Sequence, residues 1–134
     1  MVIRESLRTP AAVLYGLPFV WVGVMHFVNP ESFMAIVPPY LGMPRFWVLL
    51  TGVTEIALGL GVMWPKTRKI ACMWMILQLA LLYLANLHMW WNDVAFDGVS
   101  FGPLGHSIRL VIQLVLMAMA ASLGGLWPRA ARSD

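Results

Sequence analysis

Residues 46–64, FWVLLTGVTEIALGLGVMW, form an apolar stretch in which Glu55 is the one charged side chain. Three further stretches are similarly apolar, at residues 11–28, 70–91 and 107–127. A helix needs about 20 such residues to span the hydrocarbon core of a bilayer, and each stretch is close to that length. The sequence therefore predicts an all-α polytopic membrane protein, a single domain of residues 1–134 folded as an antiparallel bundle of four transmembrane helices.

The composition is that of a membrane protein rather than a soluble one. Apolar residues make up 60% of the chain and charged residues 11%, against about 45–50% and about 25% in an ordinary soluble domain. The single cysteine, Cys72, permits no internal disulfide and no dithiol chemistry. These features exclude a water-soluble domain and a disulfide-exchange enzyme that acts alone.

The net charge of +3 does not indicate nucleic-acid binding, because the basic residues lie next to the ends of the apolar stretches. Cytoplasmic connections of membrane proteins are rich in lysine and arginine. We therefore expect an integral protein of the cell (inner) membrane, surrounded by lipid, with both termini in the cytoplasm. The predicted cytoplasmic side holds Arg4, Arg8, Lys66, Arg68, Lys69, Arg129 and Arg132, and the outer side holds Arg45 and Arg109 with Glu31, Asp93 and Asp97.

The two predicted outer connections differ in pattern. Asn29-Pro30-Glu31 combines a residue that caps helices, a first-turn proline and an acid near the positive end of a helix dipole. We expect a short helix there, lying in the membrane interface or over the mouth of the bundle and ending at Pro38-Pro39. The connection at residues 92–106 contains three glycines and a proline without periodic pattern, which predicts an irregular loop.

Glu55 is the residue most indicative of function. It lies nine residues from Phe46, which at 1.5 Å per residue places it about 13 Å inside a hydrocarbon layer about 30 Å thick. An acid at that depth costs at least about 2.5–3.5 kcal/mol and needs a partner, a water-filled cavity or a proton. Gly52 and Gly59 share its helix face and allow close approach of a neighbouring helix. We predict that Glu55 faces the interior and handles protons.

Five further polar side chains lie nearer the outer ends of the spans: His26, Asn86, His88, Arg109 and Gln113. Counted at 1.5 Å per residue, Gln113 and Asn86 lie about 9 Å and about 7.5 Å deep, within reach of the Glu55 carboxyl. The two histidines lie at the depth of Arg109, about 9 Å above Glu55. Together these positions predict a polar ligand pocket that opens outward, with Glu55 as its floor and residues 30–39 as its cap.

The same residues admit other interpretations. Asn86 and Gln113 can serve only as hydrogen-bonding glue between helices, and histidines near the interface cost little. A bis-histidine haem at His26 and His88, or a metal held by those two and Glu55, is a further alternative. The spacing matches no recognised cluster, so we assign no metal site. A quinone or similar lipid-soluble ligand fits better, because it needs one or two hydrogen-bond donors, an apolar shaft and access from lipid.

Several short motifs resemble the DoxX-like family of small integral membrane proteins. They are Gly23-Val24-Met25-His26-Phe27 with Pro30, Val37-Pro38 with Leu41 and Pro44, Thr51-Gly52 with Glu55 and Gly59, Pro65 with Arg68, and Asn86, Arg109 and Gln113. The chain departs from the pattern at Leu84, where many relatives carry a proline before the Ala-Asn pair. The resemblance implies a four-helix scaffold that serves as a subunit of thiosulfate:quinone oxidoreductase, in redox defence, or in maturation of other proteins.

These observations predict a small membrane subunit or accessory protein of a redox-linked complex, with other membrane proteins as partners and a quinone as the candidate cofactor. The alternative is a non-enzymatic assembly factor or structural subunit in which the polar residues only hold the helices together. A proton-coupled carrier is a third alternative, disfavoured because no span is broken. The residues leave open whether the protein is an enzyme and whether it forms a homo-oligomer.

Overall fold

Helices dominate the described part of the chain. The computed structural model describes residues 4–127, and its elements are α1 (Glu5–Val28), α2 (Pro30–Met34), a 3-10 helix η1 (Pro39–Leu41), α3 (Pro44–Met63), α4 (Arg68–Asn92) and α5 (Gly102–Leu123). The helices α1, α3, α4 and α5 are each long and apolar enough to cross a membrane. The predicted all-α fold with four candidate membrane spans is confirmed. Arg129 and Arg132 lie outside the described residues.

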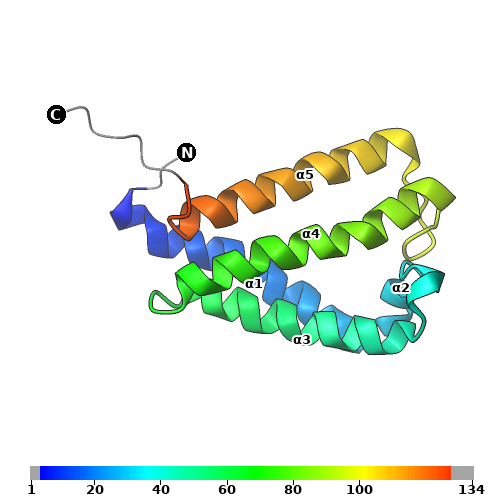
Figure 1. Ribbon diagram of the computed structural model, residues 1–134, viewed down its shortest axis with the longest axis horizontal. Coiled ribbons are helices and arrows are strands. Elements are labelled where there is room, and N and C mark those ends of the chain that lie inside the picture. The colour runs from blue at the N-terminus through cyan, green and yellow to red at the C-terminus, as the bar shows by residue number, and fades with distance from the viewer. Residues whose placement is uncertain (1–3, 128–134) are drawn as a thin grey trace.

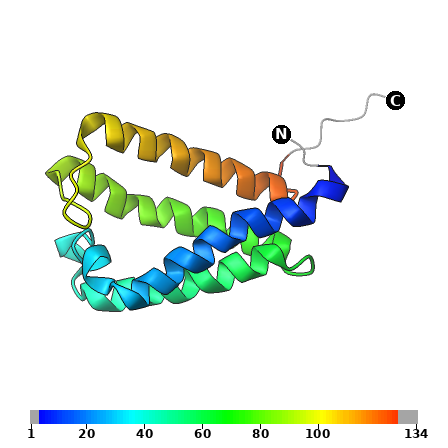
Figure 2. The same ribbon diagram turned by 180° about the vertical axis from the view of Figure 1, so that it is seen from behind.

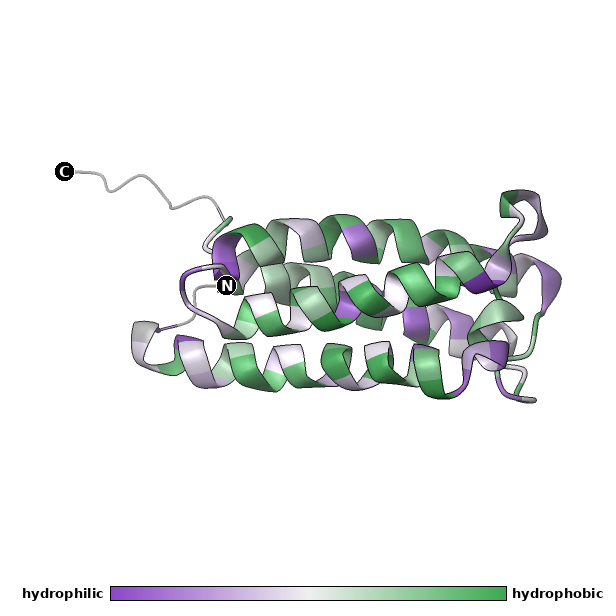
Figure 3. Ribbon diagram, turned by 90° about the horizontal axis from the view of Figure 1, so that it is seen from below, coloured by the Kyte–Doolittle hydropathy of each residue, from purple (hydrophilic) through white to green (hydrophobic). Residues whose placement is uncertain are grey.

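The four long helices lie side by side in one elongated bundle (Figure 1). The α1–α3 connection, which contains α2, and the α4–α5 connection lie together at one end, which we name the α2 end. The α3–α4 connection and both ends of the described chain lie at the opposite end, the termini end. Figure 3 shows hydrophobic residues along the helices, with hydrophilic residues mostly toward the ends and a few positions between. This layout brings residues 30–41 and 93–101 over the same end of the bundle.

The ends of two helices differ from the predicted apolar stretches. α3 and α4 begin and end within two residues of the predicted bounds, whereas α1 begins six residues earlier and α5 begins five residues earlier. Pro103 occupies the first turn of α5, a position that proline favours, and Gly124 directly follows its end. The earlier start places His106 inside α5, about one turn from its first residue, and puts Arg109 about two turns into the helix. Hydrophobicity alone missed this turn, because a helix extends beyond its most apolar part.

α1 and α3 pack at backbone contact through two pairs of glycines. A Cβ atom added to Gly16 would lie 2.5 Å from the carbonyl oxygen of Gly59, and one added to Gly59 would lie 2.8 Å from that of Gly16. Gly23 and Gly52 oppose each other in the same way. Gly16 opposes Gly59 and Gly23 opposes Gly52, so α1 and α3 run in opposite directions. Figure 2 shows α1 crossing toward α3 at the α2 end. The close approach predicted at Gly52 and Gly59 is confirmed.

An apolar core fills the half of the bundle nearer the termini end. Its buried side chains are Ala12, Tyr15, Phe19, Val62, Ala71, Cys72, Met75, Leu79, Ala120 and Leu123. Two arginines close this end. Arg68 is buried and donates from Nε to the carbonyl of Val62 at 2.9 Å, and Arg8 donates from Nε to the carbonyl of Leu123 at 3.0 Å. Both guanidinium groups lie at helix C-termini, where cations stabilise the last carbonyls.

The two connections at the α2 end contain more structure than expected. α2 begins at Pro30 as predicted, but it ends at Met34 rather than at Pro38-Pro39. The side chain of Asn29 does not cap it; its Nδ2 donates to Ser32 Oγ at 2.9 Å. The connection predicted as irregular contains a tight turn, in which Phe96 and Val99 exchange two backbone hydrogen bonds of 3.0 Å. The residues between them, Asp97-Gly98, have φ of +52° and +79°, as in a type I′ turn.

Candidate ligand-binding site

A cavity of about 490 Å³ lies among the four long helices in the half nearer the α2 end. Its polar lining comes from α1, α3, α4 and α5 and consists of His26, Glu55, Asn86, Arg109 and Gln113. Leucine, valine and phenylalanine side chains complete the walls. We name this space the polar cavity. Five of the six residues predicted for the pocket therefore line one space, and His88 does not.

Glu55 and His26 are neighbours at the centre of this cavity. The distance from His26 Nδ1 to Glu55 Oε2 is 3.4 Å, and each residue is 5% exposed. His26 Nδ1 also lies 2.8 Å from the carbonyl oxygen of Val22. Because a carbonyl only accepts hydrogen bonds, Nδ1 carries a hydrogen directed at Val22 rather than at the carboxylate. Among the described residues, nothing donates a hydrogen bond to Glu55 Oε2.

The sequence analysis placed His26 about 9 Å above Glu55, and the structure corrects this separation. Side chains lean toward the N-terminus of their own helix. Since α1 and α3 run in opposite directions, His26 leans toward the termini end and Glu55 leans toward the α2 end. The two side chains therefore converge, although their backbone positions lie at different depths.

Asn86, Arg109 and Gln113 bond to α4 and α5 rather than to Glu55. Arg109 Nη2 donates to Asn86 Oδ1 at 2.6 Å, and Gln113 Nε2 donates to the carbonyl oxygen of Leu79. The guanidinium carbon of Arg109 also lies 4.9 Å from the centre of the Phe101 ring, within cation–π range. Asn86 and Gln113 were expected within reach of the Glu55 carboxyl, but these contacts give them partners on α4 and α5 instead. They also position one cation and two amides on the wall that faces Glu55.

Aromatic side chains from the two connections cover the polar cavity. The ring of Phe33 stacks on His26 with centroids 3.8 Å apart, and Phe96 meets Phe33 edge-on at 5.2 Å. Ser32 Oγ donates to Asp97 Oδ1 at 3.1 Å and joins the two connections. The predicted cap over the pocket is thus present, but half of it comes from the second connection. Sequence reasoning missed Phe96, although the Asp97-Gly98 pair is a signal for the turn that positions it.

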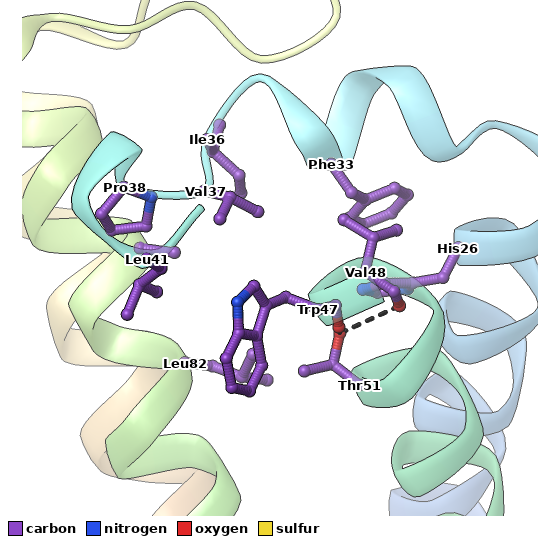
Figure 4. Close-up of a pocket in the computed structure, with 11 residues that line it drawn as sticks. His26, Phe33, Ile36, Val37, Pro38, Leu41, Trp47, Val48, Thr51 and Leu82 are labelled. Carbon is purple, nitrogen blue, oxygen red and sulfur yellow. Dashed lines mark hydrogen bonds between the residues drawn. The ribbon is translucent and has the colours of Figure 1, made fainter. Parts of the chain in front are cut away.

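The segment after α2 covers a smaller pocket of about 120 Å³ beside the polar cavity. Figure 4 shows His26 and Phe33 on one side of this pocket, Pro38 and Leu41 on the other, and Trp47 between them. His26 lines both spaces. A ligand in the polar cavity would therefore contact a residue that the cap also holds in place.

A groove of about 250 Å³ leads sideways from the polar cavity between α1 and α5. The groove and the cavity share Phe19, Val22, Glu55 and Leu116 in their linings. Leu14, on the groove wall, is 74% exposed on the outer surface of the bundle. Glu55 therefore lies where the polar cavity meets an apolar groove on the side of the bundle.

The two other histidines lie apart from Glu55. His88 Nδ1 is 3.0 Å from Asn92 Nδ2, one turn further along α4. His26 lines the polar cavity and His88 does not, so nothing in the geometry favours the alternative of a haem or metal held by the two histidines. Among residues 4–127, no three His, Cys, Asp or Glu side chains are placed to hold a metal ion. His106 is buried against Trp90, with ring centroids 5.6 Å apart, whereas we expected it just outside the helix.

Residues 15–124 match the family described as a domain of unknown function, DUF8561. The chain belongs to this family. The match to DUF8561 includes every residue that lines the polar cavity and the lateral groove apart from Leu14. No curated protein and no solved structure matches the chain. The DUF8561 family carries no described activity, so the chemistry of the cavity is the basis for any functional inference.

The cavity combines three chemical capacities. Glu55 is an ionisable group that can exchange a proton with a bound molecule, since Oε2 has no donor within the described residues. Arg109 and Asn86 offer a cation and an amide as hydrogen-bonding groups. The phenylalanine and leucine side chains around them suit a flat, apolar ring. A small ring that carries hydrogen-bond acceptors would satisfy all three.

Proposed function

We propose that this protein crosses the cell (inner) membrane four times as an antiparallel bundle, with both termini in the cytoplasm. The charge distribution supports this orientation. The termini end of the described chain holds Arg4, Arg8, Lys66, Arg68 and Lys69, whereas the α2 end holds Arg45 and Arg109 together with Glu31, Asp93 and Asp97. Positive residues favour the cytoplasmic side. In this orientation the polar cavity lies nearer the outer face, and α2 lies in the outer interface above it.

We further propose that the polar cavity binds the headgroup of a quinone or a similar lipid-soluble ligand. The observation that carries the proposal is the ring of five polar side chains around one cavity of about 490 Å³ that continues into an apolar lateral groove. A quinone headgroup has two carbonyl acceptors, and Arg109, Asn86 and His26 are the candidate binding residues. An isoprenoid tail would leave through the α1–α5 groove into lipid.

In this proposal Glu55 handles protons. Reduction of a quinone to a quinol consumes two electrons and two protons, and the electrons would come from a redox partner in the same membrane complex. Glu55, which lies next to His26, would supply one of these protons to a quinone oxygen, and water at the outer face would supply the other. The resemblance to the DoxX-like family, which stays a prediction, supports a role as a small subunit or accessory protein of such a complex.

The direct test is to identify what the protein retains. Purification in a mild detergent, followed by lipid extraction and mass spectrometry, should yield a quinone in near-stoichiometric amount. Calorimetric titration with a short-chain benzoquinone should then give saturable binding. We expect His26→Ala and Glu55→Gln to weaken this binding about tenfold or more, since a lost hydrogen bond or charge contact of about 1.4 kcal/mol has that effect.

His88→Ala is the matched control for His26→Ala. Both remove an imidazole near the α2 end, but His88 does not line the polar cavity. Affinity for the benzoquinone should stay within about twofold of wild type. Equal affinities in the wild type, His26→Ala and Glu55→Gln would show that the cavity is not the binding site.

One observation favours a second candidate function, a non-enzymatic assembly factor or structural subunit. Asn86 and Gln113 each take part in a hydrogen bond between α4 and α5, as expected for residues that only hold helices together. In this case Gln113→Leu would lower the thermal stability and the yield of co-purified partner proteins. Short-chain quinone would bind neither the wild type nor any variant.

A further inference from the structure

Gln78 is a half-buried polar side chain in the middle of α4. It lies ten residues from Arg68 at the start of the helix, about 15 Å along the axis. Gln78 lines a groove of about 630 Å³ between α3 and α4, and Leu82 lines both this groove and the polar cavity. The groove is otherwise almost entirely apolar, and its wall on α4 includes Trp74, Leu77 and Leu81.

The amide of Gln78 is incompletely bonded within the described chain. Its Nε2 donates one long hydrogen bond, of 3.5 Å, to the carbonyl oxygen of Thr51. No hydrogen bond to its Oε1 is found among residues 4–127. The two threonines of the groove are satisfied locally, because Thr51 Oγ1 donates to the Trp47 carbonyl at 2.8 Å and Thr54 Oγ1 donates to the Thr51 carbonyl at 3.0 Å.

An amide in this position needs a partner from outside the chain. In a bilayer no water reaches the hydrocarbon core to bond to it, and an unbonded amide there costs free energy. Lipid headgroups lie too far from the middle of the helix, and acyl chains offer no donor. The partner must therefore be another polar group at the same depth in the membrane.

We propose that the α3–α4 groove is the interface with a second copy of this chain. A glutamine amide contains both a donor and an acceptor, so two Gln78 side chains related by a two-fold axis satisfy each other with two hydrogen bonds. The depth of the two groups is then equal by symmetry. Around them Trp74, Leu77 and Leu81, with exposures of 58%, 46% and 58%, form one stripe on α4 that packs against its counterpart.

The arrangement leaves the ligand site accessible. The lateral groove lies between α1 and α5, whereas the proposed interface uses α3 and α4. A dimer would therefore present two polar cavities with separate openings to lipid. The proposal does not depend on which ligand the cavity binds.

The test measures association of the purified full-length protein in liposomes. Fluorescently labelled protein is reconstituted over a range of protein-to-lipid ratios, and single-molecule photobleaching steps are counted. The wild type should change from one step to two as its density rises. In Gln78→Leu the density at half-association should rise about tenfold, because each of two hydrogen bonds in a membrane contributes about threefold on average.

Thr54→Val is the matched control in the same groove. It removes a polar atom that is already bonded within α3, so its half-association density should stay within about twofold of wild type. Cysteine crosslinking locates the contact independently. In a Cys72→Ala background, Leu81→Cys should form a disulfide-linked dimer in the membrane, and Val115→Cys on the outer face of α5 should not.

Three outcomes would overturn the proposal. The first is a wild type that stays monomeric at every density, which would mean that lipid alone covers the groove. The second is Gln78→Leu associating like the wild type while Leu81→Cys fails to crosslink. The third is crosslinking of Leu81→Cys in native membranes to a different protein instead of to itself.

Discussion

At the termini end the four long helices enclose Val62, Cys72 and Met75 with no exposed surface, whereas at the α2 end the same helices enclose Glu55, His26 and a cavity of about 490 Å³. The first half is a well-packed apolar core, and at its end two arginines donate hydrogen bonds to carbonyl groups at helix C-termini. The second half has polar walls and an aromatic cover. Each helix therefore contributes to a closely packed half and to a half that contains the polar cavity.

The two halves differ in how much they are expected to stabilise the fold. Apolar side chains that fill space contribute dispersion contacts, and empty space forfeits them. A buried acid without a hydrogen bond costs free energy. Functional sites commonly carry such costs, and well-packed regions elsewhere offset them. We infer that the termini half and the α1–α3 glycine contacts hold the polar cavity open.

The largest expected effect comes from the glycine contacts that both halves share. Gly59→Leu would place a side chain where even a Cβ lies 2.8 Å from a backbone oxygen of α1. The helices must separate, so we expect a loss on the order of the whole stability of the bundle and no folded protein by circular dichroism. Ala118→Leu on the exposed face of α5 should fold normally. A folded Gly59→Leu variant would mean that the α1–α3 contact is not essential.

The next prediction compares the two halves along one helix. Met75→Ala removes a fully buried side chain from the core, and we expect it to lower the free energy of unfolding by about 2–5 kcal/mol. Leu82→Ala removes a side chain that borders the cavity and should cost less than about 2 kcal/mol, since fewer packing contacts are lost. Denaturant titration in detergent measures both. Equal losses would contradict the distinction between a packed and an unpacked half.

A smaller effect of opposite sign is expected at Glu55. In Glu55→Met no described hydrogen bond to Oε2 is lost, and His26 keeps its bond to the Val22 carbonyl. Replacing an uncompensated buried acid with an apolar side chain should therefore raise the stability of the ligand-free protein by about 1 kcal/mol. Thermal unfolding in detergent tests this, and binding of the benzoquinone should be lost in parallel. A marked destabilisation would instead assign Glu55 a structural role.

The smallest effect is expected in the cover of the cavity. Ser32→Ala removes the bond to Asp97 that joins the two connections and should change the free energy of unfolding by less than about 0.5 kcal/mol. The rate of ligand release should nevertheless rise, because the cover is held more loosely. Stopped-flow displacement of the benzoquinone measures this rate. An unchanged rate would indicate that the cover does not limit ligand release.

The depths of several candidate site residues could be predicted by counting residues along each apolar stretch. The depth of Glu55 in its apolar stretch, and of Asn86, Gln113 and Arg109 in theirs, was sufficient to predict that these side chains share one space. The prediction failed at His88 because depth says nothing about rotation around a helix. His88 is two residues from Asn86, and residues two apart do not share a face. That spacing was visible in the sequence and could have excluded His88.

Other features required the three-dimensional arrangement. The pairing of His26 with Glu55 depends on the opposite directions of α1 and α3, which make their side chains lean toward each other. The contact of Phe33 with Phe96 joins segments more than sixty residues apart. Hydrophobic periodicity predicts neither, because it describes one helix at a time.

The length and composition of the four apolar stretches alone specify four candidate membrane helices, since the thickness of the bilayer sets how many apolar residues a span needs. The distribution of lysine and arginine likewise predicts an orientation without any knowledge of packing. Which half of the bundle is filled and which contains the cavity was decided only by tertiary packing. The glycine pairs fix the register of α1 against α3, and that register places Glu55 beside an imidazole.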